Sequence, residues 1–136
     1  LNTMTTHIDK LALFSILDKK LLVVRSKGKS LFYLPGGKRE LNETDHEALL
    51  REISEELAIN LIPSTITYAA TLEAQADGKP EGSLVKLTCY FANYDGAPTP
   101  AAEIEELRYI DSNDIEICSK AAILCVDWLK ASNYIN

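Results

Sequence analysis

The feature that most constrains the fold is a helix that the sequence marks at its start and along its buried face. Thr44 is followed three residues later by Glu47, the spacing of a capping box in which each side chain binds the other residue's backbone N–H. Leu49, Ile53 and Leu57 then recur every four residues, so one stripe of the helix is apolar. The helix is therefore expected to pack on the core of a folded domain.

Strand signals surround this helix and predict the fold class. Alternating or β-branched apolar runs bounded by turn residues mark strands at 8–16, 20–25, 31–34, 65–74, 83–93 and 107–110. Pro35-Gly36-Gly37 ends the third run and starts a loop, and residues 119–130 form an apolar terminal helix. The order of strands, helix, strands and helix predicts an α/β fold, a mixed β-sheet between helices on both faces.

Length and composition indicate one globular domain. Of the 136 residues, 46% are hydrophobic and 25% charged, and no repeat or linker divides them. We expect a single domain over residues 4–136, and we interpret residues 1–3 as a cloning remnant because they precede the only methionine. The sequence shows neither an apolar run of membrane-spanning length nor a signal segment, so the expected location is cytoplasmic, without a membrane partner.

The net charge of −6 argues against a nucleic-acid polymer as the partner, because phosphate backbones select basic surfaces. A small phosphate ligand remains compatible with this charge if metal cations neutralise both partners. Cys89, Cys118 and Cys125 are too widely spaced for a zinc site and are expected to be reduced and buried. The sequence is compatible with a monomer or a homodimer.

The other face of the predicted helix carries an unusual acidic set. Glu52, Glu55 and Glu56 are spaced i, i+3 and i+4, so their carboxylates share one side of the helix. A solvated acidic surface is the ordinary interpretation of such a set. Arg51 can pair with Glu55 one turn later, and Gly36-Gly37 can expose backbone groups to a ligand, which together favour a site. Oxygen ligands alone indicate a hard cation, Mg²⁺ or Mn²⁺, and hence a metal-assisted phosphate enzyme.

The segment that contains this acidic set resembles the Nudix box, G-x5-E-x7-R-E-U-x-E-E-x-G-U, where U is apolar. The residues at the required spacings are Gly37, Glu43, Arg51, Glu52, Ile53, Glu55, Glu56 and Ile59. Leu34-Pro35-Gly36-Gly37 also resembles the strand exit that usually precedes the box. The resemblance implies a Nudix hydrolase, MutT-like, with the α/β/α sandwich of that family.

The resemblance also implies roles for the box residues. Glu52, Glu55 and Glu56 would bind the metal ions, with the carbonyl of Gly37 as a further ligand. Arg51 would orient a catalytic glutamate, and Glu43 would support the loop or the metal shell. Many relatives use one more carboxylate just before a late strand. Glu106 matches that place best because it directly precedes the strand predicted at 107–110, with Glu103 and Glu105 as rivals.

Several residues near the box are candidates for binding the substrate. Arg25, Lys38 and Arg39 could clamp phosphates, although a lone lysine or arginine is more often solvated surface. Arg25 is the preferred one, because it ends a strand that runs beside the box. Tyr33 and Tyr90 could stack on a base, but we interpret both first as core or rim residues.

The implied reaction is the attack of water on a phosphorus of a nucleoside diphosphate linked to another group. A box glutamate or Glu106 would take the proton. A nucleoside triphosphate is slightly favoured as the substrate, followed by a nucleotide sugar or ADP-ribose. The alternative is a non-catalytic Nudix domain that senses a nucleotide, and the intact acidic set weighs against it.

One position departs from the box, since the family's second glycine is Ala58 here. That glycine permits a left-handed turn, a conformation that costs alanine roughly 1 kcal/mol. Either Ala58 adopts the turn nevertheless, or the helix continues and Asn60 makes it. We expect the second, because asparagine tolerates the left-handed conformation and alanine favours the helix.

Overall fold

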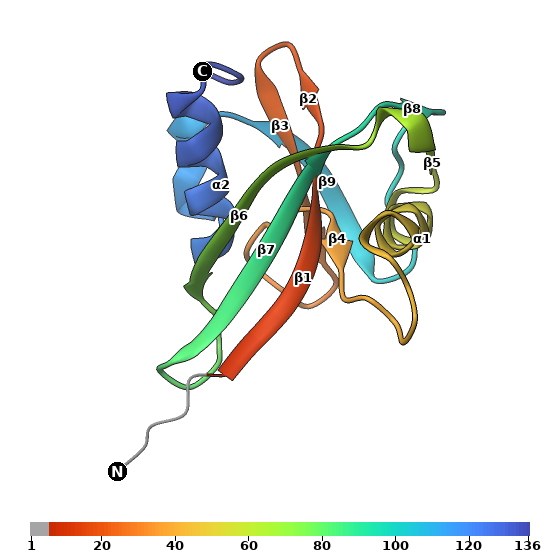
Figure 1. Cartoon of the computed structure of the whole chain (residues 1–136). Coiled ribbons are helices and arrows are strands. Elements are labelled where there is room, and N and C mark those ends of the chain that lie inside the picture. The colour runs from red at the N-terminus through yellow and green to blue at the C-terminus, as the bar shows by residue number, and fades with distance from the viewer. Residues whose placement is uncertain (1–5) are drawn as a thin grey trace.

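The computed structural model describes residues 6–136 and contains one mixed four-stranded sheet (Figure 1). Its strands follow the order β4-β1-β7-β6, with bounds Gly36–Gly37 (β4), Thr6–Phe14 (β1), Ser83–Phe91 (β7) and Thr67–Gln75 (β6). β1 runs parallel to β7, and the other two pairs are antiparallel. The predicted mixed sheet is therefore confirmed.

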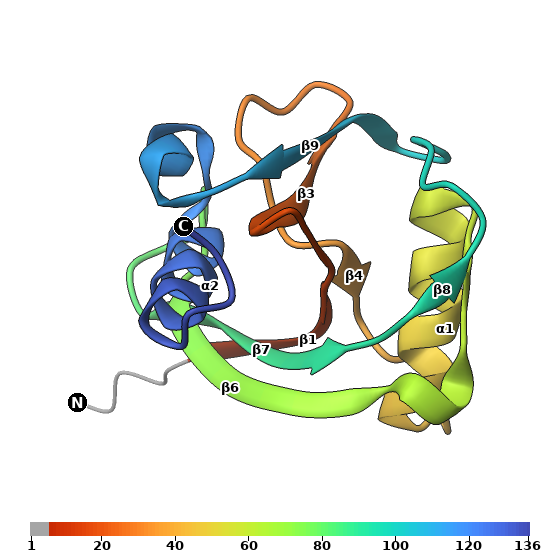
Figure 2. The same ribbon diagram turned by 90° about the horizontal axis from the view of Figure 1, so that it is seen from above.

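A second, antiparallel sheet consists of β2 (Ile16–Leu17), β3 (Lys20–Ser26) and β9 (Ile104–Ile110). A third, two-stranded sheet pairs β5 (Asn60–Leu61) with β8 (Tyr94–Asp95), and two 3₁₀ turns occupy Pro63–Thr65 and Ser112–Ile117. Seen from above, α1 (Asp45–Leu57) and α2 (Lys120–Ala131) lie on opposite sides of the two larger sheets (Figure 2). This is the predicted α/β/α sandwich.

The strands supply two separate cores because successive side chains point to opposite faces. On β1, Ala12 and Phe14 pack toward α2, whereas Leu11 and Leu13 pack toward α1. The three cysteines are free and buried in the described structure, as expected. Neither helix of the described part has the length and apolar character needed to cross a membrane.

Both helix starts agree with the sequence prediction. Thr44 accepts from the backbone N–H of Glu47, whose side chain accepts from the backbone N–H of Thr44, so the capping box is complete. The apolar stripe of α1 is fully buried, with Leu49, Ile53 and Leu57 each 0% exposed. Ser119 caps α2 by accepting from the backbone N–H of Ala122.

Several strand predictions need correction, and the first is that Gly36-Gly37, predicted to start a loop, pairs with β1 as strand β4. Residues 31–34 do not form a strand, because their backbone is divided between two partners: Phe32 bonds to Ile117 and Ser119, and Tyr33 bonds to Val24. The strand predicted at 107–110 begins earlier, at Ile104, which is 3% exposed. Glu106 therefore lies inside β9 rather than ahead of it.

The expectation for the end of α1 was also wrong. Ala58 itself is the left-handed residue, with φ 54° and ψ 36°, and its N–H donates to the Ser54 carbonyl at 3.1 Å. The turn places Ile59 in the core at 1% exposure, and Asn60 already belongs to β5. Burying an isoleucine contributes about 1.5–3 kcal/mol, which exceeds the roughly 1 kcal/mol that the left-handed conformation costs alanine.

Candidate active site

The paired glycines allow the chain to pass close to both β1 and α1. Gly36 has φ 146°, and a Cβ there would overlap the backbone of Leu11. A Cβ on Gly37 would overlap the carboxylate of Glu52. Only glycine fits both positions without displacing its neighbours, so β4 can lie between β1 and the carboxylates of α1.

Glu56 is the buried member of the acidic set. It is 7% exposed, and its Oε1 accepts a 2.9 Å hydrogen bond from the backbone N–H of Gly36. Burial raises the pKa of Glu56 to about 8, although the Gly36 hydrogen bond opposes the shift, and the nearby carboxylates of Glu103 and Glu52 add to it. In the described part of the chain no ion pair involves Glu56. Among residues 6–136 the charged form of Glu56 is thus stabilised by the Gly36 hydrogen bond but by no salt bridge.

Glu52 lies one turn before Glu56 on the same side of α1. Its side chain is 16% exposed and accepts a 2.9 Å hydrogen bond from Nη1 of Arg51. Burial raises the pKa of Glu52, and the Arg51 guanidinium partly offsets that effect.

Arg51 ties the loop after the glycines to the helix. Its Nε and Nη2 donate to the two carboxylate oxygens of Glu43 at 2.7 and 2.8 Å, and Nη2 also donates to the Lys38 carbonyl at 3.0 Å. The hydrogen bonds from Arg51 lower the pKa of Glu43 to about 2. The predicted pair with Glu55 is present at 3.5 Å but is longer than the bonds to Glu43 and Glu52. Arg51 thus fixes the loop and Glu52 together.

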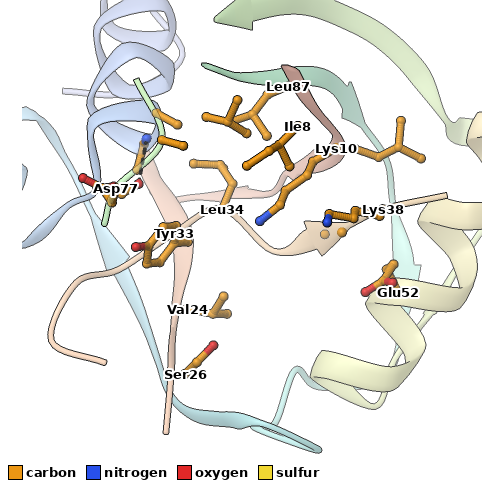
Figure 3. Close-up of a pocket in the computed structure, with 18 of the residues that line it drawn as sticks. Ile8, Lys10, Val24, Ser26, Tyr33, Leu34, Lys38, Glu52, Asp77 and Leu87 are labelled. Atoms are coloured by element: carbon orange, nitrogen blue, oxygen red, sulfur yellow. Dashed lines mark hydrogen bonds between the residues drawn. The ribbon is translucent and has the colours of Figure 1, made fainter. Parts of the chain in front are cut away.

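A cavity of about 510 Å³ opens beside these carboxylates. Glu52 from α1 lies at one end and Tyr33 with Asp77 at the other, as Figure 3 shows. The wall between them is largely apolar and includes Ile8, Leu34, Val85 and Leu87. The remaining charged groups of the lining are Glu56, Glu103, Lys10, Lys29, Lys38 and Lys79. An acidic end, basic groups and an apolar wall suit a ligand that combines phosphates with an organic group.

Comparison with known proteins assigns the family. A model of the NUDIX domain matches residues 7–124, which is most of the chain. The chain belongs to the Nudix family. It is 30% identical over 101 residues to a protein named ADP-ribose pyrophosphatase from Methanocaldococcus jannaschii; the match covers 72% of this chain and 58% of that protein. The chain therefore spans little more than half the length of this relative.

Solved structures show that the fold is shared with Nudix proteins. The ORF135 protein of E. coli superposes with a TM-score of 0.73 at 23% identity, covering 95% of this chain and 92% of the other. A MutT NUDIX hydrolase from Burkholderia pseudomallei superposes with a TM-score of 0.76 at 21% identity, covering 91% and 98%. The expected family and fold are confirmed.

Within the Nudix box, the acidic residues differ in their surroundings. Glu52, Glu56 and Gly37 line the cavity, whereas Glu55 lies outside it with a side chain 54% exposed. Among the rivals for the late carboxylate, Glu103 lines the cavity at the turn before β9. Glu106 does not. It accepts from Arg25 at 3.3 Å and from Arg108 at 2.8 Å.

Strand alternation explains why Arg25 is outside the cavity. Its neighbours Val24 and Ser26 line the cavity from β3, so the side chain between them points to the opposite face. Arg25 pairs there with Glu106 across the sheet. Arg39 is also outside the cavity and is held by Asp9 at 3.3 Å and by Asp45.

Lys38 and Tyr33 do line the cavity, and burial raises the pKa of Tyr33. Tyr90 is instead 8% exposed in the core on the α1 side, where its hydroxyl donates to Asp45 at 2.7 Å. The first interpretation of Tyr90 as a core residue is therefore confirmed.

Lys10, Ser26 and Asp77 were not among the predicted site residues, although they line the cavity. A sequence signal existed for Lys10. In the alternating pattern of β1 it shares a face with Ile8, Ala12 and Phe14, all of which pack toward the core. A lysine at such an inward position is unusual unless its charge has a use. Asp77 lies in the turn-rich segment between β6 and β7, where the sequence carries no comparable signal.

The oxygen-donor set that lines the cavity fits a hard divalent cation. Glu52, Glu56 and Glu103 offer carboxylate oxygens, and both Glu52 and Glu56 have raised pKa values chiefly because they are buried, a cost that a cation would offset. Within residues 6–136, however, no three acidic, histidine or cysteine side chains converge as a complete metal cage. Mg²⁺ commonly binds through one or two carboxylates, water and substrate phosphates, so a partial protein site is compatible with it.

Proposed function

We propose that this chain is a metal-dependent hydrolase that cuts a phosphoanhydride bond in a nucleoside diphosphate linked to another group. The observation that carries the proposal is the burial of Glu56 beside Glu52 at the acidic end of the cavity. A buried carboxylate without a cationic partner is costly for a fold to keep. Binding a cation together with a phosphorylated substrate gives this arrangement a purpose.

Glu52, Glu56 and the Gly37 carbonyl are the groups proposed to hold Mg²⁺ or Mn²⁺, with Glu55 available at the edge of the site. When bound, the cation would neutralise phosphate charge and lower the pKa of bound water. Arg51 fixes the rotamer of Glu52 through the 2.9 Å hydrogen bond. Glu103 faces the same cavity and is, by position, a better candidate than Glu106 to accept a proton from the attacking water.

ADP-ribose is the first substrate to test, because the relative from Methanocaldococcus jannaschii is named an ADP-ribose pyrophosphatase. Nucleoside triphosphates and nucleotide sugars follow, since the cavity combines an acidic end with an apolar wall that suits any of these classes. In each case the reacting diphosphate would lie near Glu52 and Lys38. The organic group would lie toward Tyr33 and Asp77.

The test is a hydrolysis screen across these nucleotides in Mg²⁺ or Mn²⁺, with matched reactions in excess chelator. We expect turnover of at least one class that disappears when the chelator is added. Products labelled from ¹⁸O-water would identify the phosphorus that is attacked. Full activity in chelator would refute the metal assignment, and nucleotide binding without turnover on any substrate would favour the sensor alternative.

A further inference from the structure

Lys10 occupies a central and unusual place in the cavity. It lies on β1, between the apolar residues Ile8 and Leu11 that also form the wall. In Figure 3 its amine points into the cavity on the side of the Lys38 amine, and Lys38 is the charged group that affects Lys10 most. Lys10 therefore faces the space between the acidic end of the site and the end that carries Tyr33.

The surroundings of this lysine favour an anion next to it. Burial and the nearby ammonium of Lys38 lower the pKa of Lys10, and the attraction of Glu56 and Glu52 only partly opposes this. Within residues 6–136 the side chain of Lys10 forms no ion pair, in contrast to Arg39, which is held by two carboxylates. Two neighbouring ammonium groups repel each other, and a multiply charged anion between them would relieve that repulsion.

The other cations near the site are less suited to this task. Arg25 and Arg39 do not line the cavity and form ion pairs with Glu106, Asp9 and Asp45. Lys29 and Lys79 line the cavity but are exposed. Lys10 is the partly buried one, so its interaction with an anion is screened less by solvent.

We propose that Lys10 is a phosphate-binding residue that contacts the phosphoryl group of the substrate farther from Glu52 and Glu56, on the side of Tyr33. The proposal rests on the function proposed above and specifies it. A ligand with two linked phosphoryl groups would reach both the acidic end and Lys10, whereas a monophosphate can occupy only one of the two positions. Lys10 would therefore select for a diphosphate unit.

The test compares Lys10→Met, which keeps the length and removes the charge, with Lys10→Arg, which keeps the charge. Lys20→Met is the matched control, since Lys20 is an exposed lysine on β3 outside the cavity. Steady-state kinetics would use the best substrate of the screen. Calorimetry would measure binding of α,β-methylene-ADP, of AMP and of Mn²⁺ alone, with thermal unfolding as the check on folding.

We expect Lys10→Met to raise the KM and the Kd of α,β-methylene-ADP by at least about tenfold, with kcat changed by less than about threefold, as for loss of uniform binding. The AMP affinity should fall by less than the α,β-methylene-ADP affinity, because a monophosphate can move from Lys10 to the acidic end, and Lys10→Arg should restore most of the diphosphate affinity. Binding of Mn²⁺ alone should not weaken, because the variant removes a positive charge near the carboxylates. A merely structural lysine would instead weaken all three ligands together.

The outcomes separate this proposal from the one on which it rests. Unchanged KM and diphosphate affinity in folded Lys10→Met would overturn the role of Lys10 while leaving the hydrolase intact. A wild-type protein that is inactive yet binds α,β-methylene-ADP in a Lys10-dependent manner would refute the hydrolase and support the phosphate contact. A wild-type protein that binds no α,β-methylene-ADP would overturn the Lys10 proposal directly.

Discussion

The two sides of the central sheets contrast in what they bury. On the α2 side, the core holds Phe14, Val126 and Leu129, and Trp128 stacks with Tyr134 at a centroid distance of 6.2 Å. On the α1 side, Leu49, Ile53 and Leu57 form an equally closed apolar layer, but Glu56 from the same helix is buried as well.

This difference indicates that the two helices serve different needs. Residues of α2 contribute mainly by removing apolar surface from water. α1 does this with one stripe while holding carboxylates in a position that costs stability. A site built on α1 therefore depends on the rigid packing of its apolar stripe, whereas α2 lines the cavity only with small apolar residues of its first turn, Ala121 and Ala122.

The largest expected effect comes from removing the buried charge on the α1 side. Glu56→Gln keeps an acceptor for the Gly36 N–H but removes a proposed metal ligand, so turnover should fall by at least about a hundredfold. Unfolding in urea should show no loss of stability, because a neutral amide is less costly to bury. Glu116→Gln, at an exposed glutamate, is the control. Wild-type turnover in Glu56→Gln would remove this residue from the mechanism.

A substitution in the core on the α2 side should lower stability while leaving turnover unchanged, the opposite of the result expected for Glu56→Gln. Leu129 is 0% exposed, and Leu129→Ala should lower the free energy of unfolding by about 2–5 kcal/mol. Turnover per folded molecule should stay within about twofold of wild type. Urea unfolding and active-site titration measure the two quantities. A folded variant with strongly reduced turnover would show that the α2 side also shapes the site.

The pH dependence of stability in chelator should report the buried carboxylate. The pKa of Glu56 is about 8 when folded and near its usual 4.5 when unfolded, so the folded state binds more protons between these values. The contribution of Glu56 to the free energy of unfolding should therefore be fully present below about pH 4.5 and be lost as the pH rises through 8. We expect a decrease of roughly 2 kcal/mol between pH 6 and 8. The decrease should vanish in Glu56→Gln; if it persists there, another group causes it.

The smallest effect concerns the left-handed turn that ends α1. Because Ala58 has φ 54°, Ala58→Gly should relieve strain and raise the free energy of unfolding by up to about 1 kcal/mol, less the added entropy of the unfolded chain. Ala131→Gly, at the last helical residue of α2, should instead destabilise by about 0.5–1 kcal/mol. Equal losses in both variants would contradict the left-handed assignment. Catalysis should survive both changes.

Features that depend on the geometry of one helix could be predicted from the sequence. The capping box at Thr44, the buried stripe from Leu49 to Leu57 and the common side of Glu52 and Glu56 all follow from the fixed repeat of 3.6 residues per turn. The importance of Gly36-Gly37 was also recognisable, although the pair was predicted to start a loop and forms β4 against β1, where close backbone approach requires glycine. Local sequence alone therefore determined which residues form the acidic site and which cap and glycine pair flank it.

Features that depend on contacts between distant segments were decided only by the tertiary structure. The β3–β9 pairing extends to Ile104 through a register shift between Arg25 and Ser26. In the resulting arrangement Glu103 lines the cavity, whereas Glu106 pairs with Arg25. Ala58 adopts a conformation against its local preference because Ile59 must reach the core. Lys10 enters the cavity because β1 lies centrally in the four-stranded sheet. In each case burial or strand pairing with a segment distant in sequence outweighs a small local preference. The spacing of residues in the sequence does not reveal where that distant segment lies.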